Sequence, residues 1–212
     1  AETVEITSGR SKSLELARRI GFRRREAMAL HSLGLTLAHL GEYGAALAAQ
    51  ERYVALSEQI SQHAARAWGP AAMALVYVQQ LDVHRAEAAL NRARKAAEEN
   101  AWPELLAWTR HLSGLLKLLR HLERRDTLQL SLARADFLAS LDLLEDNKRG
   151  WSEALDPAEV AACLALTWLC AGNQKQAAMV LPRARAWGPA SAHSAHVVSA
   201  LEALVARQPP SN

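Results

Sequence analysis

The chain has 212 residues, of which 50% are apolar and 22% are charged, and its formal net charge is +3 at pH 7. This balance excludes a disordered chain and predicts one well-buried unit or a short array of repeats. No apolar run reaches the ~20 residues of a membrane-spanning helix, and the opening AETVEITSGR lacks a secretory signal, so we expect a cytoplasmic protein without a membrane partner.

Alanine and leucine dominate the sequence, β-branched residues are sparse, and no run alternates apolar and polar residues over the length of a strand. This pattern predicts an all-α fold. Residues 1–10 show no periodicity, so we expect a flexible lead-in there. Residues 11–21 predict a short helix that ends at Gly21 and resembles the second half of a repeat, which favours a piece cut from a larger array.

Residues 27–56 predict two antiparallel helices joined by a tight corner at Gly41-Glu42-Tyr43. Apolar side chains recur every three to four positions in each helix, and Gly34 lies among them, where a second helix can approach closely. Such a pair has one apolar face too many to be stable alone, so it predicts neighbouring pairs that cover this face.

The same pattern returns at a fixed step of about 40 residues, which is the length of a helix-pair repeat. Gly34 is followed by Ala74 and Gly114, three small residues at the predicted helix crossings, whereas the fourth small residue, Ala165, comes later than this step. The predicted units are a partial repeat over 11–21 and four repeats over 22–60, 62–100, 102–146 and 156–187.

The excess residues before the fourth repeat fall in the polar stretch 146–151, which predicts a longer loop, and Pro157 is expected in the first turn of the following helix. A last helix over residues 190–207 is expected to cap the array, followed by a tail over 208–212. Pro70 lies inside a predicted helix, where we expect a kink or a break.

One stretch of the first pair resembles the tetratricopeptide motif, at Leu33-Gly34, Leu37, Gly41, Tyr43 and Ala46. The match weakens in the second and third copies, where Leu81 and His121 take the place of Gly41, and it returns at Gly172. Residues 16–30 look like the longer variant of this repeat found in large bacterial signalling proteins and maltose-activator-type regulators. The resemblance covers about residues 22–187 and implies a right-handed α-solenoid of antiparallel helix pairs, a superhelix without an active site.

In a tetratricopeptide superhelix the first helix of each pair lines the concave side. Positions counted from the small residues place apolar, aromatic and imidazole side chains in this groove: Met28, His31, Leu35, His39, Trp68, Leu75, Val78, Gln79, Trp108, His111, Leu115 and Leu118. We expect a non-catalytic scaffold that binds an amphipathic helix or apolar peptide segment, with Trp68 and Trp108 as anchors. The partner is a protein or a second copy of the chain. The alternative is that these side chains are ordinary core and that the histidines are structural.

A second functional hypothesis is a small-effector sensor, in which the array closes around a metabolite and passes the change to an attached activator, kinase or cyclase domain. An enzyme is not expected, because the sequence has no phosphate-binding glycine loop, no Gly-x-Ser-x-Gly and no His-Glu-x-x-His. No cofactor is expected either.

Cys163 and Cys170 lie about 10 Å apart along one predicted helix, too far for a disulfide, so we expect reduced, buried thiols and no metal site. Basic residues gather in two places, without a recognition pattern for nucleic acid: Arg10, Lys12, Arg18, Arg19, Arg23, Arg24 and Arg25, and then Arg120, Arg124 and Arg125. These clusters would suit an acidic partner or a phosphate backbone, but we interpret them as solvated helix faces and expect no nucleic-acid partner.

Overall fold

The structure is a computed structural model that describes residues 2–146, 155–187 and 192–207. These residues form ten α-helices and no strand, which confirms the all-α prediction for the described part of the chain. The chain divides into two compact units, residues 1–101 and 102–212. A single repeat domain over residues 11–207 stays a prediction.

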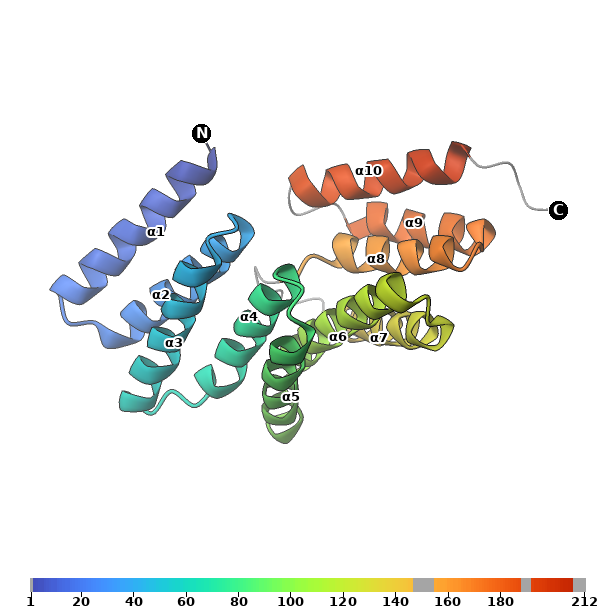
Figure 1. The fold of residues 1–212 in the computed structure, drawn as a ribbon. Coiled ribbons are helices and arrows are strands. Elements are labelled where there is room, and N and C mark those ends of the chain that lie inside the picture. Colours follow the sequence, from blue (N-terminus) through green and yellow to red (C-terminus); the bar gives the residue numbers. More distant parts are fainter. Residues whose placement is uncertain (1, 147–154, 188–191, 208–212) are drawn as a thin grey trace. The chain divides into compact units, whose positions relative to one another are not determined.

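Unit 1 contains five helices (Figure 1): α1 (Glu2–Arg19), α2 (Arg23–His39), α3 (Tyr43–Gln59), α4 (Ala65–Gln79) and α5 (Val83–Glu99). The helices pack in pairs, α2 with α3 and α4 with α5. The pairs are joined by contacts of α3 and α2 with α4, and α1 packs against α2. The predicted repeats 22–60 and 62–100 each contain one of these pairs.

Helix α1 corrects one expectation, because residues 2–10 are helical rather than an irregular lead-in. The reason is tertiary: Leu14 of α1 joins Ala27 and Leu30 of α2 in one buried cluster. The Arg10 guanidinium also donates to the Ser32 carbonyl of α2 at 2.6 Å. Packing against a neighbour stabilises a helix whose own sequence shows no clear period.

The helix ends of unit 1 recur at equal intervals along the sequence. A residue with left-handed backbone follows each helix: Gly21 (φ 70°), Gly41 (79°), Ser61 (56°), Leu81 (59°) and Ala101 (51°). At the first four of these ends the next N–H bonds the carbonyl five residues back: Phe22 to Ala17, Glu42 to Leu37, Gln62 to Ser57 and Asp82 to Tyr77, at 2.8–2.9 Å. This is the Schellman pattern of helix termination. Two such ends per helix pair account for the repeat step in this unit.

Leu81→Gly is expected to raise the free energy of unfolding by about 1 kcal/mol, because a left-handed residue with a side chain is strained by roughly 1–2 kcal/mol and glycine is not. Leu81 is 61% exposed, so little packing is lost. Denaturant unfolding checks the effect. Leu40→Gly is the matched control, because Leu40 has a right-handed backbone (φ −83°) and glycine is expected to destabilise there. Equal losses of stability in both variants would contradict the explanation.

Of the two outcomes expected at Pro70, a kink or a break, the break is wrong, since α4 runs from Ala65 to Gln79 with Pro70 inside it. The carbonyl that loses its helical partner belongs to Arg66, an exposed residue in the first turn of α4, so Pro70 removes a hydrogen bond near the helix end and not in its middle. Gly69 lets this part of α4 approach α3 closely, because a Cβ there would lie 2.3 Å from Val54 Cγ2.

Unit 2 contains the other five helices (Figure 1): α6 (Pro103–Arg124), α7 (Thr127–Asp146), α8 (Pro157–Cys170), α9 (Gln174–Trp187) and α10 (Ala192–Arg207). Helix α6 packs with α7, α8 packs with α9 and with α7, and α10 lies against both α8 and α9, as expected of a capping helix. Pro157 opens α8 as expected, and Asp156 caps it by accepting from the Ala158 N–H at 2.9 Å. The predicted loop lies outside the described residues from 147 on, as does the tail 208–212.

The third corner lies four residues later than expected. His121, matched to Gly41 in the sequence, is buried inside α6, and the left-handed residue is Arg125 (φ 57°). The start of α7 explains the shift, because the Asp126 carboxylate accepts from the Leu128 N–H at 2.9 Å. His121 Nδ1 is bonded to the Asp126 carbonyl at 2.8 Å, which fixes the extra turn.

The predicted small residues do mark close helix crossings. A Cβ on Gly34 of α2 would lie 2.4 Å from Gln50 Nε2 of α3, and one on Gly114 of α6 would lie 2.6 Å from Phe137 Cε1 of α7. Ala74 is fully buried, and so is Ala165 in unit 2. Each pair therefore has a small residue on its first helix, within the packed interior.

Candidate interaction surface on the first helices

The first helices of unit 1, α2 and α4, carry eight of the predicted groove residues, and these two helices are in contact. Met28 is 47% exposed and His39 is exposed, whereas Leu35 and Val78 are buried and belong to the core. The remaining four are half-buried: His31, Trp68, Leu75 and Gln79. We call the six that reach the surface the α2/α4 face: Met28, His31, His39, Trp68, Leu75 and Gln79.

An aromatic cluster joins the two helices at this face. The His31 ring of α2 and the Trp68 ring of α4 meet edge to face, with centroids 6.2 Å apart and planes at 77°. The Tyr53 ring of α3 lies 4.8 Å from His31 on another side, and burial raises the pKa of Tyr53 to about 12. The structure thus brings together two side chains that sequence reasoning placed in the groove.

His31 is hydrogen-bonded to Gln50 of α3, whose side chain is fully buried. The Gln50 amide nitrogen donates to the His31 carbonyl at 3.0 Å, so its oxygen is left to accept from His31 Nδ1–H, also at 3.0 Å. Burial lowers the pKa of His31, against an opposing effect of this hydrogen bond. His31 Nε2 then has a lone pair that makes no hydrogen bond within the described residues, and it can accept one from a partner.

The predicted groove of unit 2 is closed. Trp108 is 1% exposed, and His111 and Leu118 are also buried, so only Leu115 of the four predicted residues is half-buried. The hypothesis that Trp108 anchors a partner is therefore wrong, and the alternative that it belongs to the core holds. The physical reason is that α6 packs against both α7 and α8, which cover this side of the helix.

His111 is a buried base that faces α8. Its Nε2 lies 4.0 Å from Glu159 Oε1, its ring lies 5.7 Å from Phe137, and its Nδ1 has no hydrogen-bond partner among the described residues. Burial lowers the pKa of His111 to about 4, so the ring is neutral at pH 7. These contacts fit a structural histidine, which was the alternative to its predicted place in the groove.

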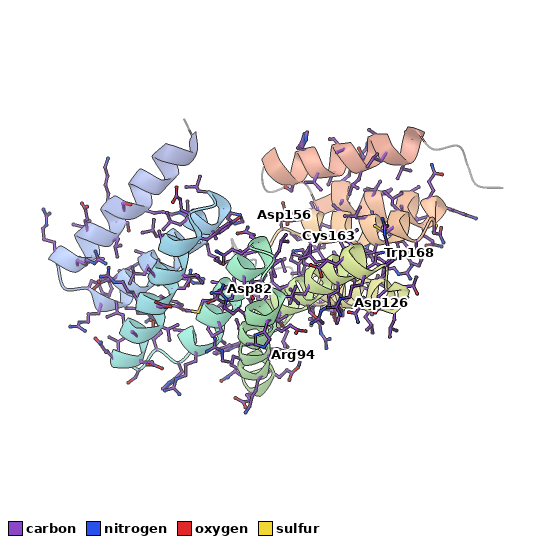
Figure 2. The ribbon with its side chains drawn as sticks, in the orientation of Figure 1. Asp82, Arg94, Asp126, Asp156, Cys163 and Trp168 are labelled. Carbon is purple, nitrogen blue, oxygen red and sulfur yellow. The ribbon has the colours of Figure 1, made fainter. Side chains whose placement is uncertain are left out.

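The cysteines differ from expectation in their exposure, because Cys163 is half-buried and Cys170 is exposed. Figure 2 shows Cys163 and Trp168 on α8. Burial of the sulfur, followed by the charge of Glu159, raises the pKa of the Cys163 thiol. A raised pKa keeps the thiol protonated and unreactive. Among the described residues, no three His, Cys, Asp or Glu side chains gather into a metal site.

A charged cluster between α6 and α7 was missed by sequence reasoning. The buried Asp136 carboxylate accepts from Ser113 Oγ at 2.6 Å, lies 3.2 Å from the Arg110 guanidinium, and is also contacted by the Lys117 ammonium. Arg110, Ser113 and Lys117 share one face of α6, and Asp136 precedes the buried Phe137 of α7. The sequence signal that could have predicted this cluster was the position of Asp136, an acidic residue next to an apolar helix position. The cluster ties the two helices together.

A hollow of about 220 Å³ lies between α9 and α10, lined by Leu181 and Val205 and bordered by the Arg185–Glu202 ion pair. This volume is below the ~300–1,000 Å³ of typical small-molecule sites. The hollow therefore gives the small-effector hypothesis little support.

Within the described part of the chain, no helix has both the length and the apolar character needed to cross a bilayer.

No protein-family model and no curated protein matches this sequence. Several solved structures are similar to it. One of them is the crystal structure of BtubC (BKLC) from P. vanneervenii, with a TM-score of 0.53 and 15% sequence identity. The similarity covers 100% of this chain and 95% of that chain. At this identity the comparison shows a shared fold and nothing more.

Proposed function

We propose that this chain is a tetratricopeptide-like α-solenoid that acts as a protein-interaction scaffold, with its α2/α4 face as the binding surface. The solenoid arrangement is supported by the evenly spaced left-handed helix ends of unit 1 and by the first pair, both of whose helices contact α4 of the next pair. In such an array each pair buries the apolar face of its neighbour, and the first helices form a continuous surface.

The proposal rests on the ring contact between His31 and Trp68 and on the exposed Met28, which lies three residues before His31 on α2. Met28 leaves nearly half of its surface exposed, and the two rings come from neighbouring first helices. A flexible apolar side chain beside half-buried rings is typical of surfaces that receive an apolar partner. The partner is an amphipathic helix or apolar segment, and the acceptor at His31 Nε2 favours one with an N–H or O–H donor beside its apolar face.

Met28→Asp is expected to weaken binding of an amphipathic helical peptide at least about tenfold, because a carboxylate would replace the exposed apolar surface. Fluorescence anisotropy over a panel of labelled Leu-rich helical peptides provides the measurement. Leu132→Asp is the matched control, since Leu132 is 40% exposed and also lies within a helix, α7. Its affinity should equal that of the unmodified protein.

Trp68 supplies a second readout, because an indole that becomes covered by an apolar partner shifts its fluorescence to the blue. Trp68→Phe should remove this shift and retain most of the binding. No binding in the whole panel, or equal losses in Met28→Asp and Leu132→Asp, would refute the proposal.

A further inference from the structure

The corner between α1 and α2 carries an exposed patch of apolar and basic side chains. Ile20 is 62% exposed and Phe22 is 49% exposed, on either side of the left-handed Gly21. Arg19 precedes them and Arg24 and Arg25 follow them in the sequence, and all three arginines are exposed. We call these five side chains the basic corner: Arg19, Ile20, Phe22, Arg24 and Arg25.

The three arginines of the basic corner are exposed and make no hydrogen bond or ion pair with the residues that the structure describes. Their neighbours differ: Arg18 pairs with Glu26 at 2.9 Å, and Arg23 donates to Gln59 of α3 at 2.7 Å. Arg18 and Arg23 therefore serve the fold, whereas the charges of Arg19, Arg24 and Arg25 are left uncompensated.

The end of α3 has the same left-handed termination as the end of α1 and serves as an internal comparison, although α4 begins at Ala65, two residues later than the matching start of α2. Its N–H groups bond the equivalent carbonyls, with Gln62 to Ser57 in place of Phe22 to Ala17. One repeat further along the chain, Arg19, Phe22 and Arg24 correspond to Gln59, Gln62 and Ala64. The same left-handed helix end thus forms with glutamine in place of Arg19 and Phe22, so the termination itself does not require an arginine or a phenylalanine.

Exposed apolar side chains among like charges carry a cost in the free protein. The arginines repel one another, and Ile20 and Phe22 remain in contact with water. Arginine and aromatic residues are the types enriched where protein partners bind. The combination fits a partner that brings both negative charge and apolar side chains.

We propose that the basic corner binds an acidic segment of a partner protein in which Asp and Glu alternate with Leu or Phe. Carboxylates would pair with the guanidinium groups, and the apolar side chains would cover Ile20 and Phe22. Arg24 and Arg25 are consecutive on α2 and point about 100° apart, which suits a flexible segment that bends around the corner better than a flat bilayer. Single-stranded nucleic acid is disfavoured, because Phe22 is one aromatic ring beside an aliphatic residue and gives no series of stacking surfaces.

This inference goes beyond the α2/α4 face and concerns a second surface of unit 1. The probe is a labelled peptide of Asp and Glu with Leu or Phe at every third or fourth position, titrated into the full chain. The test variant is Arg19→Gln/Phe22→Gln/Arg24→Ala, which places the residues of the α3–α4 corner at the α1–α2 corner. It should fold normally, since glutamines occupy the matching positions at the end of α3 and alanine favours the helix at position 24, and unchanged thermal unfolding checks this.

The variant is expected to bind the peptide at least about tenfold more weakly, from the loss of two ion pairs and one apolar contact. The charge-matched control is Arg52→Gln/Arg92→Gln, which also removes two exposed arginines from unit 1, on α3 and α5, and should change affinity by less than about twofold. Affinity should also fall as salt is raised.

Three further probes complete the test: an all-acidic peptide, a single-stranded oligonucleotide, and phosphatidylserine-containing vesicles. Weaker binding of all three than of the acidic apolar peptide supports the inference. Equal binding of the all-acidic peptide would overturn the role of Ile20 and Phe22, and tighter binding of the oligonucleotide or the vesicles would overturn the protein partner. Equal losses in the corner variant and the charge-matched control would show general charge attraction and overturn the site.

Discussion

Gly114→Ala is expected to lower the free energy of unfolding of unit 2 by about 3 kcal/mol, because the new methyl group has no room. A Cβ at this position would lie 2.6–2.8 Å from three atoms of the Phe137 ring. Phe137 is fully buried and its ring is rigid, so α6 and α7 would have to separate or the ring would have to leave its rotamer. Urea or guanidinium unfolding, followed by circular dichroism, provides the measurement.

Gly44→Ala is the control for the intrinsic preference of helices for alanine. Nothing lies within 4 Å of a Cβ at Gly44 in the first turn of α3, so this change should be neutral or slightly stabilising. Gly114→Ala/Phe137→Leu supplies the second test. A smaller side chain at 137 makes room for the methyl group, so the double variant should lose less than the sum of the two single changes. Strict additivity would contradict the steric explanation.

Acidification is expected to destabilise unit 2 through His111, by about 3 kcal/mol between pH 6.5 and 4. Burial lowers the pKa of His111 from 6.5 to about 4 in the folded protein. Below pH 6.5, His111 therefore binds a proton in the unfolded chain but not in the folded chain, and this difference favours unfolding. The loss grows as the pH falls and levels off near pH 4, where the folded ring also becomes protonated.

His111→Leu provides the comparison, because leucine is of similar size and does not titrate. The variant's stability should fall less steeply between pH 6.5 and 5, where carboxylates contribute little. Glu159 is the charged group that faces the ring, at 4.0 Å from Nε2, and Glu159→Gln should leave most of the pH dependence in place. Parallel pH profiles for His111→Leu and the unmodified protein would show that His111 is not the source.

Local rules made the helix pairs predictable. Gly21 and Gly41 mark helix ends because they take left-handed backbone easily, and the helix pairs begin and end within three residues of the predicted repeats. The third corner was misplaced because His121 stands where Gly41 stands in the first copy, whereas the cap at Asp126 decides where α6 stops. Leu81 shows the converse, because it stands in the place of Gly41 and adopts the left-handed backbone although leucine has no preference for it.

The candidate site was less predictable, because helical period alone does not tell a groove from a core. Trp68 and Trp108 occupy equivalent positions, yet Trp68 is half-buried and Trp108 is sealed by its neighbours. Which helices cover a position is a tertiary property. Asp136 was missed for the same reason, since its partners come from another helix.

The bends of unit 1 are set by main-chain hydrogen bonds, and four different residue types adopt a positive φ angle there. The side chains exposed at a bend can therefore change without changing the direction in which the backbone turns. A helix pair of this kind can in principle be duplicated, deleted or given new residues at its bend while the neighbouring helix pairs keep their geometry. In such an architecture, related proteins can evolve different binding residues at the bends while their buried core stays the same.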